Sequence, residues 1–250
     1  MGLMKVNDYG RLCTEMYEYL HAQAPADELA FYLSYAKKEA RILEALCGSG
    51  RFLVPFLERG YAIEGLDASP EMLDKLKAKS PRAVAYEADL ITYTSEVHYD
   101  YIFVSSGSMS LFTDEAVCLK VLRTLKNLLA PSGVLVFAVD TVANRCADDM
   151  SYRVTAEAVL AKNKRLVLRS KNRYDVATHT QFSPGIYELY EGDILLQAEK
   201  MDFQTHLYTF GEMERHLQAL GFTDVHTYAD FDKTPAIDDG AEMFLFECRC

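Results

Sequence analysis

An apolar strand that runs directly into a glycine turn is the feature that most constrains how this chain can fold. Residues 42–52 read ILEALCGSGRF, and we expect a helix to follow through about residue 59. Glycine lets the backbone come close to a ligand, and the amides at the start of the helix can contact it. Since ligands bind at the carboxyl ends of strands in open α/β sheets, this stretch predicts a ligand site in an α/β fold.

Short apolar strands alternate with helices over residues 41–149. After the strand at 41–47 we expect four more, at 61–66, 83–86, 100–105 and 134–139. Ser69 and Asp114 are good helix-capping residues at the starts of two intervening helices. Apolar strands that alternate with helices predict a parallel sheet with helices on both faces.

The other segments complete the single domain that we expect over residues 1–250. Residues 1–40 predict an N-terminal helical cap, a pair of amphipathic helices that pack on the core in preference to closing over a substrate. Residues 209–250 resume the α/β core of 41–149, with a capping-box spacing at 209–212. Strands near 223–228 and 243–248 would form a closing antiparallel hairpin.

Residues 150–208 break the alternation of strands and helices. They are rich in strand patterns, at 164–178, 185–191 and 194–207, with a plausible tight turn at 192–193. We therefore expect an antiparallel β insertion in the α/β core. Homodimer formation through this insertion is a further expectation.

Composition excludes several classes of protein. The chain has 37 acidic and 26 basic residues, a formal net charge of −11 that counts against nucleic-acid binding. No apolar run approaches the roughly 18 residues of a membrane span, and residues 1–8 lack the apolar core of a signal peptide. The six cysteines are irregularly spaced without a C-x-x-C pair, so we expect no disulfide framework and no metal site. These features favour a cytoplasmic protein.

Two kinds of nucleotide ligand compete for the glycine turn. A dinucleotide site requires G-x-G-x-x-G, and Leu53 stands at the third glycine position. A nucleoside without a pyrophosphate fits better, because Asp67 ends the next strand and can accept hydrogen bonds from a ribose diol. Asp89 follows the strand after that, where it could accept from an adenine amino group. Each acid alone could be an ordinary turn former, but the combination with the glycine turn is specific.

These motifs resemble those of the class I S-adenosylmethionine-dependent methyltransferases. Residues 43–73 are similar to the first two family motifs, 88–90 to the third, 99–103 to the fourth and 128–135 to the start of the fifth strand. The resemblance implies a Rossmann-like, seven-stranded, mostly parallel sheet with a reversed last strand. It also implies S-adenosylmethionine as the cofactor.

The resemblance further implies which residues form the cofactor site. Glu44, Gly48 and Gly50 would shape its methionine and ribose end, and Asp67 would hold the ribose hydroxyls. Met72 would lie near the adenine and Asp89 would accept from its amino group, while residues 105–107 would border the sulfonium. The full set implied is Glu44, Ala45, Leu46, Cys47, Gly48, Ser49, Gly50, Arg51, Asp67, Ala68, Met72, Ala88, Asp89, Leu90, Ser105, Ser106 and Gly107.

The sequence departs from the family pattern at Leu46, where the family usually has glycine. We expect Leu46 to keep a β-region backbone and to turn its side chain into the core. On that basis Leu46→Gly would lower stability, because a buried leucine side chain contributes about 1.5–3 kcal/mol.

The predicted reaction is an in-line displacement that moves a methyl group to a nitrogen or oxygen of a small molecule. Two alternatives are a protein methyltransferase and a non-catalytic nucleoside- or partner-binding protein that kept the fold. An NAD-dependent oxidoreductase is a third, weakened by Leu53. None of the six histidines lies in a motif that makes it a general base, so the catalytic residue stays unknown.

The candidate acceptor-binding residues are Tyr17, Ser108, Arg169 and Arg173. Alternation along the strand at 164–178 puts the two arginines on one face together with Arg165 and Lys171. A solvated outer face is the favoured interpretation of that basic strand. A patch for an anionic substrate or an acidic partner is the alternative.

Overall fold

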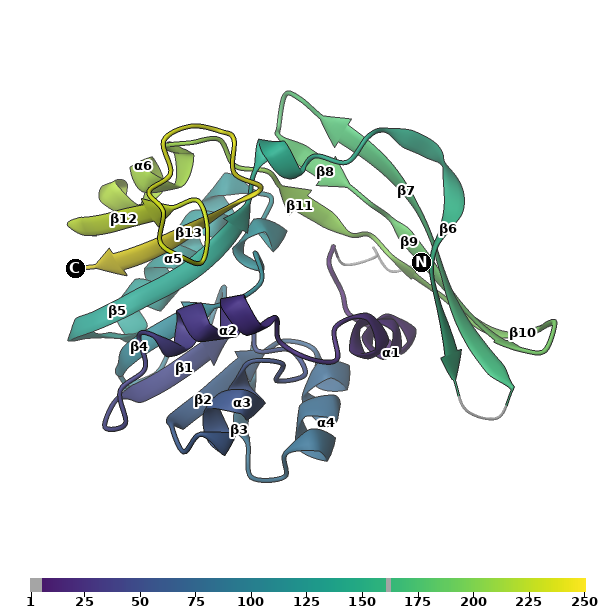
Figure 1. Ribbon diagram of the computed structural model, residues 1–250, viewed down its shortest axis with the longest axis horizontal. Coiled ribbons are helices and arrows are strands. Elements are labelled where there is room, and N and C mark those ends of the chain that lie inside the picture. Colours follow the sequence, from purple (N-terminus) through teal and green to yellow (C-terminus); the bar gives the residue numbers. More distant parts are fainter. Residues whose placement is uncertain (1–5, 161–162) are drawn as a thin grey trace.

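The computed structural model describes residues 6–160 and 163–250, which form two β-sheets with a helix lying between them (Figure 1). Residues 1–5 of the expected cap therefore lie outside the described residues. The larger sheet has seven strands in the order β12-β13-β5-β4-β1-β2-β3. The strands are β1 (Arg41–Ala45), β2 (Ala62–Asp67), β3 (Val84–Glu87), β4 (Tyr99–Val104), β5 (Leu129–Asp140), β12 (Asp224–Tyr228) and β13 (Met243–Arg249).

Strand direction in this sheet agrees with the sequence prediction. The neighbouring pairs among β1 to β5 are parallel, whereas β13 runs antiparallel to both β5 and β12. The predicted Rossmann-like sheet with a reversed last strand is thereby confirmed. The carboxyl ends of β1, β2, β4 and β5 consequently meet at one edge.

Helices cover both faces of the sheet, as their capping residues and apolar stripes predict. Ser69 caps α4 by accepting from the Met72 amide at 3.2 Å, and Asp114 caps α5 by accepting from the Val117 amide at 3.0 Å. Three of these helices, α2, α3 and α4, pack on one face and the other two, α5 and α6, on the opposite face. The bounds are α2 (Ala26–Leu33), α3 (Leu53–Glu58), α4 (Pro70–Lys79), α5 (Glu115–Leu128) and α6 (Glu212–Ala219).

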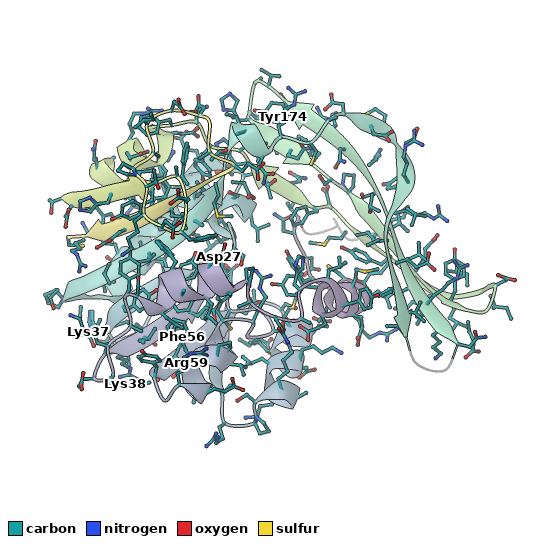
Figure 2. All side chains as sticks on the ribbon, viewed as in Figure 1. Asp27, Lys37, Lys38, Phe56, Arg59 and Tyr174 are labelled. Atoms are coloured by element: carbon teal, nitrogen blue, oxygen red, sulfur yellow. The ribbon has the colours of Figure 1, made fainter. Side chains whose placement is uncertain are left out.

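Aromatic stacking consolidates the face under α2 and α3. Phe103 of β4 stacks between Tyr32 of α2 and Phe56 of α3, with ring centroids 5.0 and 5.1 Å away. Figure 2 labels Phe56 in the lower left of the view, together with the cations Lys37, Lys38 and Arg59. Lys37 and Lys38 precede β1, and Arg59 precedes β2. They therefore mark the edge where the strands begin, which leaves the carboxyl edge for ligands.

The second sheet is the predicted antiparallel insertion. Its path is β10-β9-β7-β8-β11, and β6 pairs with β7 along the outer edge. The β9–β10 hairpin turns at residues 192–193, as predicted. The strands are β6 (Asp149–Leu160), β7 (Lys164–Asp175), β8 (Thr180–Phe182), β9 (Gly185–Glu191), β10 (Ile194–Met201) and β11 (Gln204–His206).

Two details of the insertion differ from the prediction. Strand β6 was not predicted, although apolar residues alternate with polar ones over residues 149–158; most of its side chains are exposed. The single strand expected at 194–207 is two strands, since β10 pairs with β9 and β11 pairs with β8. The chain changes partner at Asp202 and Phe203.

Helix α1 (Arg11–Leu20) lies between the two sheets (Figure 1). Its apolar side packs Leu12 and Met16 against the insertion, while its acidic side pairs Glu15 with Lys75 and Glu18 with Lys79 of α4. The expectation of two helices packed on the core is therefore right for α2 and wrong for α1. Helix α1 instead joins the insertion to the α/β core.

Two short 3-10 helices, η1 (Met109–Leu111) and η2 (Val142–Asn144), follow β4 and β5. They begin the loops at the carboxyl edge. Within residues 6–160 and 163–250, no helix has the length and apolar character needed to cross a membrane.

Candidate functional site

The turn after β1 needs glycine for a steric reason. Gly48 and Gly50 have φ angles of +50° and +79°, in the left-handed region that side chains disfavour. A Cβ at Gly50 would lie 2.3 Å from Cδ1 of Leu76 on α4. Glycine therefore allows the turn and α4 to approach each other closely.

Asp67, at the carboxyl end of β2, holds this turn in place. Its Oδ2 accepts a hydrogen bond from the Gly48 amide at 2.8 Å, and its Oδ1 accepts from the Ser69 amide at 2.9 Å. Burial raises the pKa of Asp67, although these amide hydrogen bonds oppose the shift. The carboxylate thus sits between the glycine turn and the start of α4.

Leu46 adopts a left-handed backbone, with φ of +58°. The expected β-region conformation is therefore wrong, because the turn after β1 demands the conformation that glycine adopts freely. The side chain is partly buried and packs against the core under α5 and α6, as expected. Leu46 is absent from the wall of the cavity described below.

Two buried polar atoms at this edge have no hydrogen-bond partner among the described residues: Oε2 of Glu44 and Nε of Arg51. The other carboxylate oxygen of Glu44 accepts from the Ser105 hydroxyl at 3.2 Å, and burial raises the pKa of Glu44 to about 8. Arg51 donates to the Ser106 hydroxyl and lies 5.9 Å from the Tyr17 ring. In its ionised form, which a bound cation favours, Glu44 offers one free acceptor, and Arg51 offers one free donor; together they complement the ammonium and carboxylate of an amino acid. The methionine end of S-adenosylmethionine fits this requirement.

The loop after β4 is strained and held by a residue that the sequence did not reveal. Ser106 and Gly107 have φ angles of +57° and +66°. Glu28 of α2, only 5% exposed, accepts from the Ser106 amide at 2.8 Å and from its hydroxyl at 3.1 Å. Nothing in a single helix sequence distinguishes Glu28 from a solvated acid, so only the folded structure identifies it.

A cavity of about 370 Å³ opens beside this loop. Three separate parts of the chain form its wall: helix α1 with its flanking residues, the carboxyl edge of the large sheet, and the inner face of the insertion. The carboxyl edge contributes the loops after β1 and β4 and the last residue of β5. The predicted residues at the cavity are Tyr17, Arg51, Ser106, Gly107 and Ser108. The predicted cofactor residues of the glycine turn and Asp67 lie on the same edge of the sheet.

Several predicted residues lie elsewhere. Arg169 pairs with Glu188 at 3.0 Å, and Arg173 pairs with Asp175 at 3.6 Å and lies 4.3 Å from the Phe182 ring. The assignment of both arginines as acceptor-binding residues is corrected, because Leu168 and Ser170 of the same strand face the cavity and alternation turns the arginines away.

Other predicted cofactor residues make contacts within the protein. Asp89 is exposed and accepts from the Ile91 amide at 2.8 Å, so it closes its own turn. Ser49 accepts from the Lys79 ammonium at 3.1 Å. Ala45 and Leu90 are fully buried in the core, where their side chains are out of reach of a ligand at the cavity.

Asp140 is a cavity residue that the sequence analysis missed. It ends β5, lines the cavity, and burial raises the pKa of its carboxyl to about 6. The rule that singled out Asp67 and Asp89, an acid at the carboxyl end of a strand, applies equally to Asp140. That rule could have found it.

The glycine turn, the acid that ends β2 and the reversed last strand are typical of an α/β protein whose ligand site lies at the carboxyl edge of the sheet. A family model described as a methyltransferase domain matches residues 16–227. The chain belongs to the class I S-adenosylmethionine-dependent methyltransferases, whose cofactor is S-adenosylmethionine. The resemblance inferred from the sequence motifs is confirmed.

Two solved structures share the fold over nearly the whole chain. The CcbJ methyltransferase from Streptomyces caelestis has a TM-score of 0.76 and 20% identity, over 97% of each chain. The sugar N-methyltransferase KedS8 from Streptoalloteichus sp ATCC 53650 has a TM-score of 0.74 and 17% identity, over 100% of this chain and 99% of that one. The insertion is part of the shared fold, since the matches extend over residues beyond the α/β core.

Among curated proteins, malonyl-[acyl-carrier protein] O-methyltransferase 1 of Ilyobacter polytropus is 32% identical over 118 residues. These residues are 45% of this chain and 42% of that protein. The chain spans about half the length of the curated relatives that it matches.

Proposed function

We propose that this protein transfers a methyl group from S-adenosylmethionine to a small-molecule acceptor. The observation that carries the proposal is the cavity of about 370 Å³ beside the loop after β4. Its volume is within the range of small-molecule sites, roughly 300–1,000 Å³. The insertion and α1 wall it off on the side away from the sheet, which favours a small acceptor over a protein side chain on a folded partner.

Four groups of this chain would hold the cofactor. Asp67 would accept from the ribose hydroxyls, Glu44 would pair with the ammonium of the methionine end and Arg51 with its carboxylate. The unpartnered atoms of Glu44 and Arg51 support the last two assignments. Asp89 is proposed for the adenine amino group, since its exposed carboxylate has one oxygen outside its own turn. When bound, S-adenosylmethionine supplies a methyl group already activated by the sulfonium.

The protein's contribution is mainly positioning. Holding an acceptor in line can supply about 7–11 kcal/mol of the barrier, provided that the reacting atoms are closely aligned. The fixed loop at Ser106 and Gly107 and the apolar wall from Met16, Leu168 and Met201 support this role, because they orient an acceptor and exclude water. The acceptor nucleophile is a nitrogen or an oxygen, and the relatives KedS8, a sugar N-methyltransferase, and the malonyl O-methyltransferase represent both kinds.

Calorimetry on Asp67→Ala tests the cofactor site. We expect at least a tenfold loss of affinity for S-adenosylhomocysteine, because hydrogen bonds to a charged group contribute about 1.5–3 kcal/mol each. Asp74→Ala, at an exposed position on α4, is the matched control and should bind normally. Equal affinity of wild type and Asp67→Ala would remove Asp67 from the site.

Incubation of the wild type with S-adenosylmethionine and a metabolite library, followed by mass spectrometry, tests the acceptor class. We expect a product heavier by one methyl group and the appearance of S-adenosylhomocysteine. Cofactor binding without any product would favour the non-catalytic alternative. Methylated protein in place of a methylated metabolite would favour the protein methyltransferase.

A further inference from the structure

We propose that Asp140 is a catalytic residue that binds the acceptor through an amine and takes a proton from it. The proposal deepens the proposed function and rests on it, since it assigns an acceptor class to the same cavity.

The backbone of Asp140 is held on both sides. Its amide donates to the Ser110 hydroxyl at 2.8 Å, and its carbonyl accepts from the Tyr208 amide at 2.9 Å. The carboxylate accepts one hydrogen bond from a described side chain, from Asn144 to Oδ1 at 3.3 Å. Asp140 is therefore fixed at the end of β5, while Oδ2 has no such partner among the described residues.

The carboxylate lies against the loop that borders the proposed methyl-transfer position. A Cβ at Gly107 would lie 3.1 Å from Oδ1 and 3.3 Å from Oδ2 of Asp140. Gly107 belongs to the segment 105–107 that we assign to the sulfonium end of the cofactor. Because glycine has no side chain there, nothing from Gly107 stands between the carboxylate and the cavity.

The wall of the cavity offers the Asp140 carboxylate few charged neighbours. Among the described lining residues Asp140 is the only carboxylate, and Arg51, the only guanidinium, donates to the Ser106 hydroxyl. Of the lining residues that the structure describes, His21 is the one imidazole and Cys13 the one thiol, and the others are apolar side chains, hydroxyl groups and glycines. A carboxylate in such surroundings is stabilised by a cationic partner that also donates hydrogen bonds. An ammonium group meets both conditions, whereas a neutral hydroxyl meets only the second.

The same carboxylate can act on the bound amine. The acceptor enters as R–NH₃⁺, and one proton moves to Asp140, which leaves a lone pair on nitrogen. That lone pair forms the new N–C bond as the C–S bond breaks, with its electron pair remaining on sulfur, and the product is R–NH₂⁺–CH₃. The proton on Asp140 then passes to solvent. Burial raises the pKa of the carboxyl to about 6, which brings it closer to the range suited to this exchange.

Matched amine and alcohol probes test the proposal directly. Glucosamine with glucose, and tyramine with tyrosol, differ only in the group that would meet Asp140. In calorimetry with S-adenosylhomocysteine present, we expect the wild type to bind at least one amine tenfold or more tightly than its alcohol. Asp140→Asn should abolish this preference through the loss of amine affinity, with alcohol affinity unchanged.

Controls separate this proposal from the broader one. Asp148→Asn removes an acid that follows β5 in the same connection but is absent from the cavity wall, so the amine preference should persist. Thermal unfolding checks that Asp140→Asn folds, and Asp140→Ala serves as a second variant. If the wild type binds S-adenosylhomocysteine but prefers no amine, or if Asp140→Asn keeps the preference, the role of Asp140 is overturned alone. Absence of S-adenosylhomocysteine binding by the wild type overturns the proposed function itself.

Discussion

At the scale of single residues, the glycine turn is defined by left-handed backbone conformations. Leu46, Gly48 and Gly50 all have positive φ angles within five residues. A leucine in the left-handed region costs about 1–2 kcal/mol. Glycine at position 46 would avoid that cost, whereas leucine tolerates it and gains a partly buried apolar side chain.

Substitutions at Leu46 measure this strain. Leu46→Ala loses the side chain but keeps the strain, so we expect it to lower the free energy of unfolding by about 1–2 kcal/mol. Leu46→Gly loses the same side chain but relieves the strain, so it should be more stable than the alanine variant by about 1 kcal/mol. This replaces the expectation that Leu46→Gly is simply destabilising. Urea denaturation of the three proteins checks the order, and an alanine variant more stable than the glycine variant would contradict it.

Glu44 makes stability depend on pH. Its pKa rises from 4.5 to about 8 through burial, so between these values the folded protein keeps a proton that the unfolded chain releases. The free energy of unfolding therefore falls as pH rises through this window. We expect the melting temperature to drop less between pH 5 and 8 in Glu44→Gln than in the wild type. The control Glu39→Gln, at an exposed position, should follow the wild type, and parallel curves for all three proteins would refute the assignment.

At the scale of elements, α1 packs between the insertion and the α/β core. Leu12 and Met16 are each 1% exposed and face the insertion, whereas two ion pairs tie the other side of the helix to α4. Ion pairs at partly exposed positions contribute little, typically below about 1 kcal/mol. The apolar contact therefore dominates the attachment of α1.

Alanine substitutions within α1 test that conclusion. Leu12→Ala should lower the free energy of unfolding by about 2–5 kcal/mol, because it removes a buried side chain from the contact with the insertion. Leu20→Ala, in the same helix but 48% exposed, should change it by less than about 0.5 kcal/mol. Chemical denaturation measures both. Similar values for the two variants would show that α1 is attached by other contacts.

The elements also show how far sequence reasoning extends. The strands of the main sheet, the capped helices and the β9–β10 hairpin were predictable, because apolar runs and capping residues are local signals. Strand β6 was also predictable, because residues 150–154 begin an alternation of apolar and polar residues, but this signal was not used. The left-handed backbone of Leu46, the buried role of Glu28 and the placement of α1 depend on contacts between residues distant in sequence. Asp140 was predictable from its position after β5 but was passed over.

At the scale of the whole molecule, the basic strand faces away from the proposed chemistry. Arg169 and Arg173 pair with acids of the insertion, and Leu168 and Ser170 take the cavity side of β7. The outer surface of the insertion also exposes Val159 of β6. Homodimer formation through the insertion stays a prediction, and this outer surface is where we expect it.

The double variant Arg169→Gln/Arg173→Gln separates the two roles considered for the basic strand. We expect unchanged affinity for S-adenosylhomocysteine and unchanged methyl transfer, because neither arginine reaches the cavity. Light scattering after size-exclusion chromatography would report any change in the oligomeric state. Loss of acceptor turnover in a variant with a normal oligomeric state would restore the arginines to the acceptor site.

The cavity wall has a consequence for how this protein could diversify. The groups proposed to hold the methyl donor lie at or just after the carboxyl ends of β1, β2 and β3, whereas much of the acceptor side comes from the insertion strands and α1. Mutations in the insertion can therefore reshape the acceptor side while the donor side keeps its sequence. New acceptor preferences could arise in this lineage by drift within one segment of the gene, with the ancestral donor chemistry inherited intact.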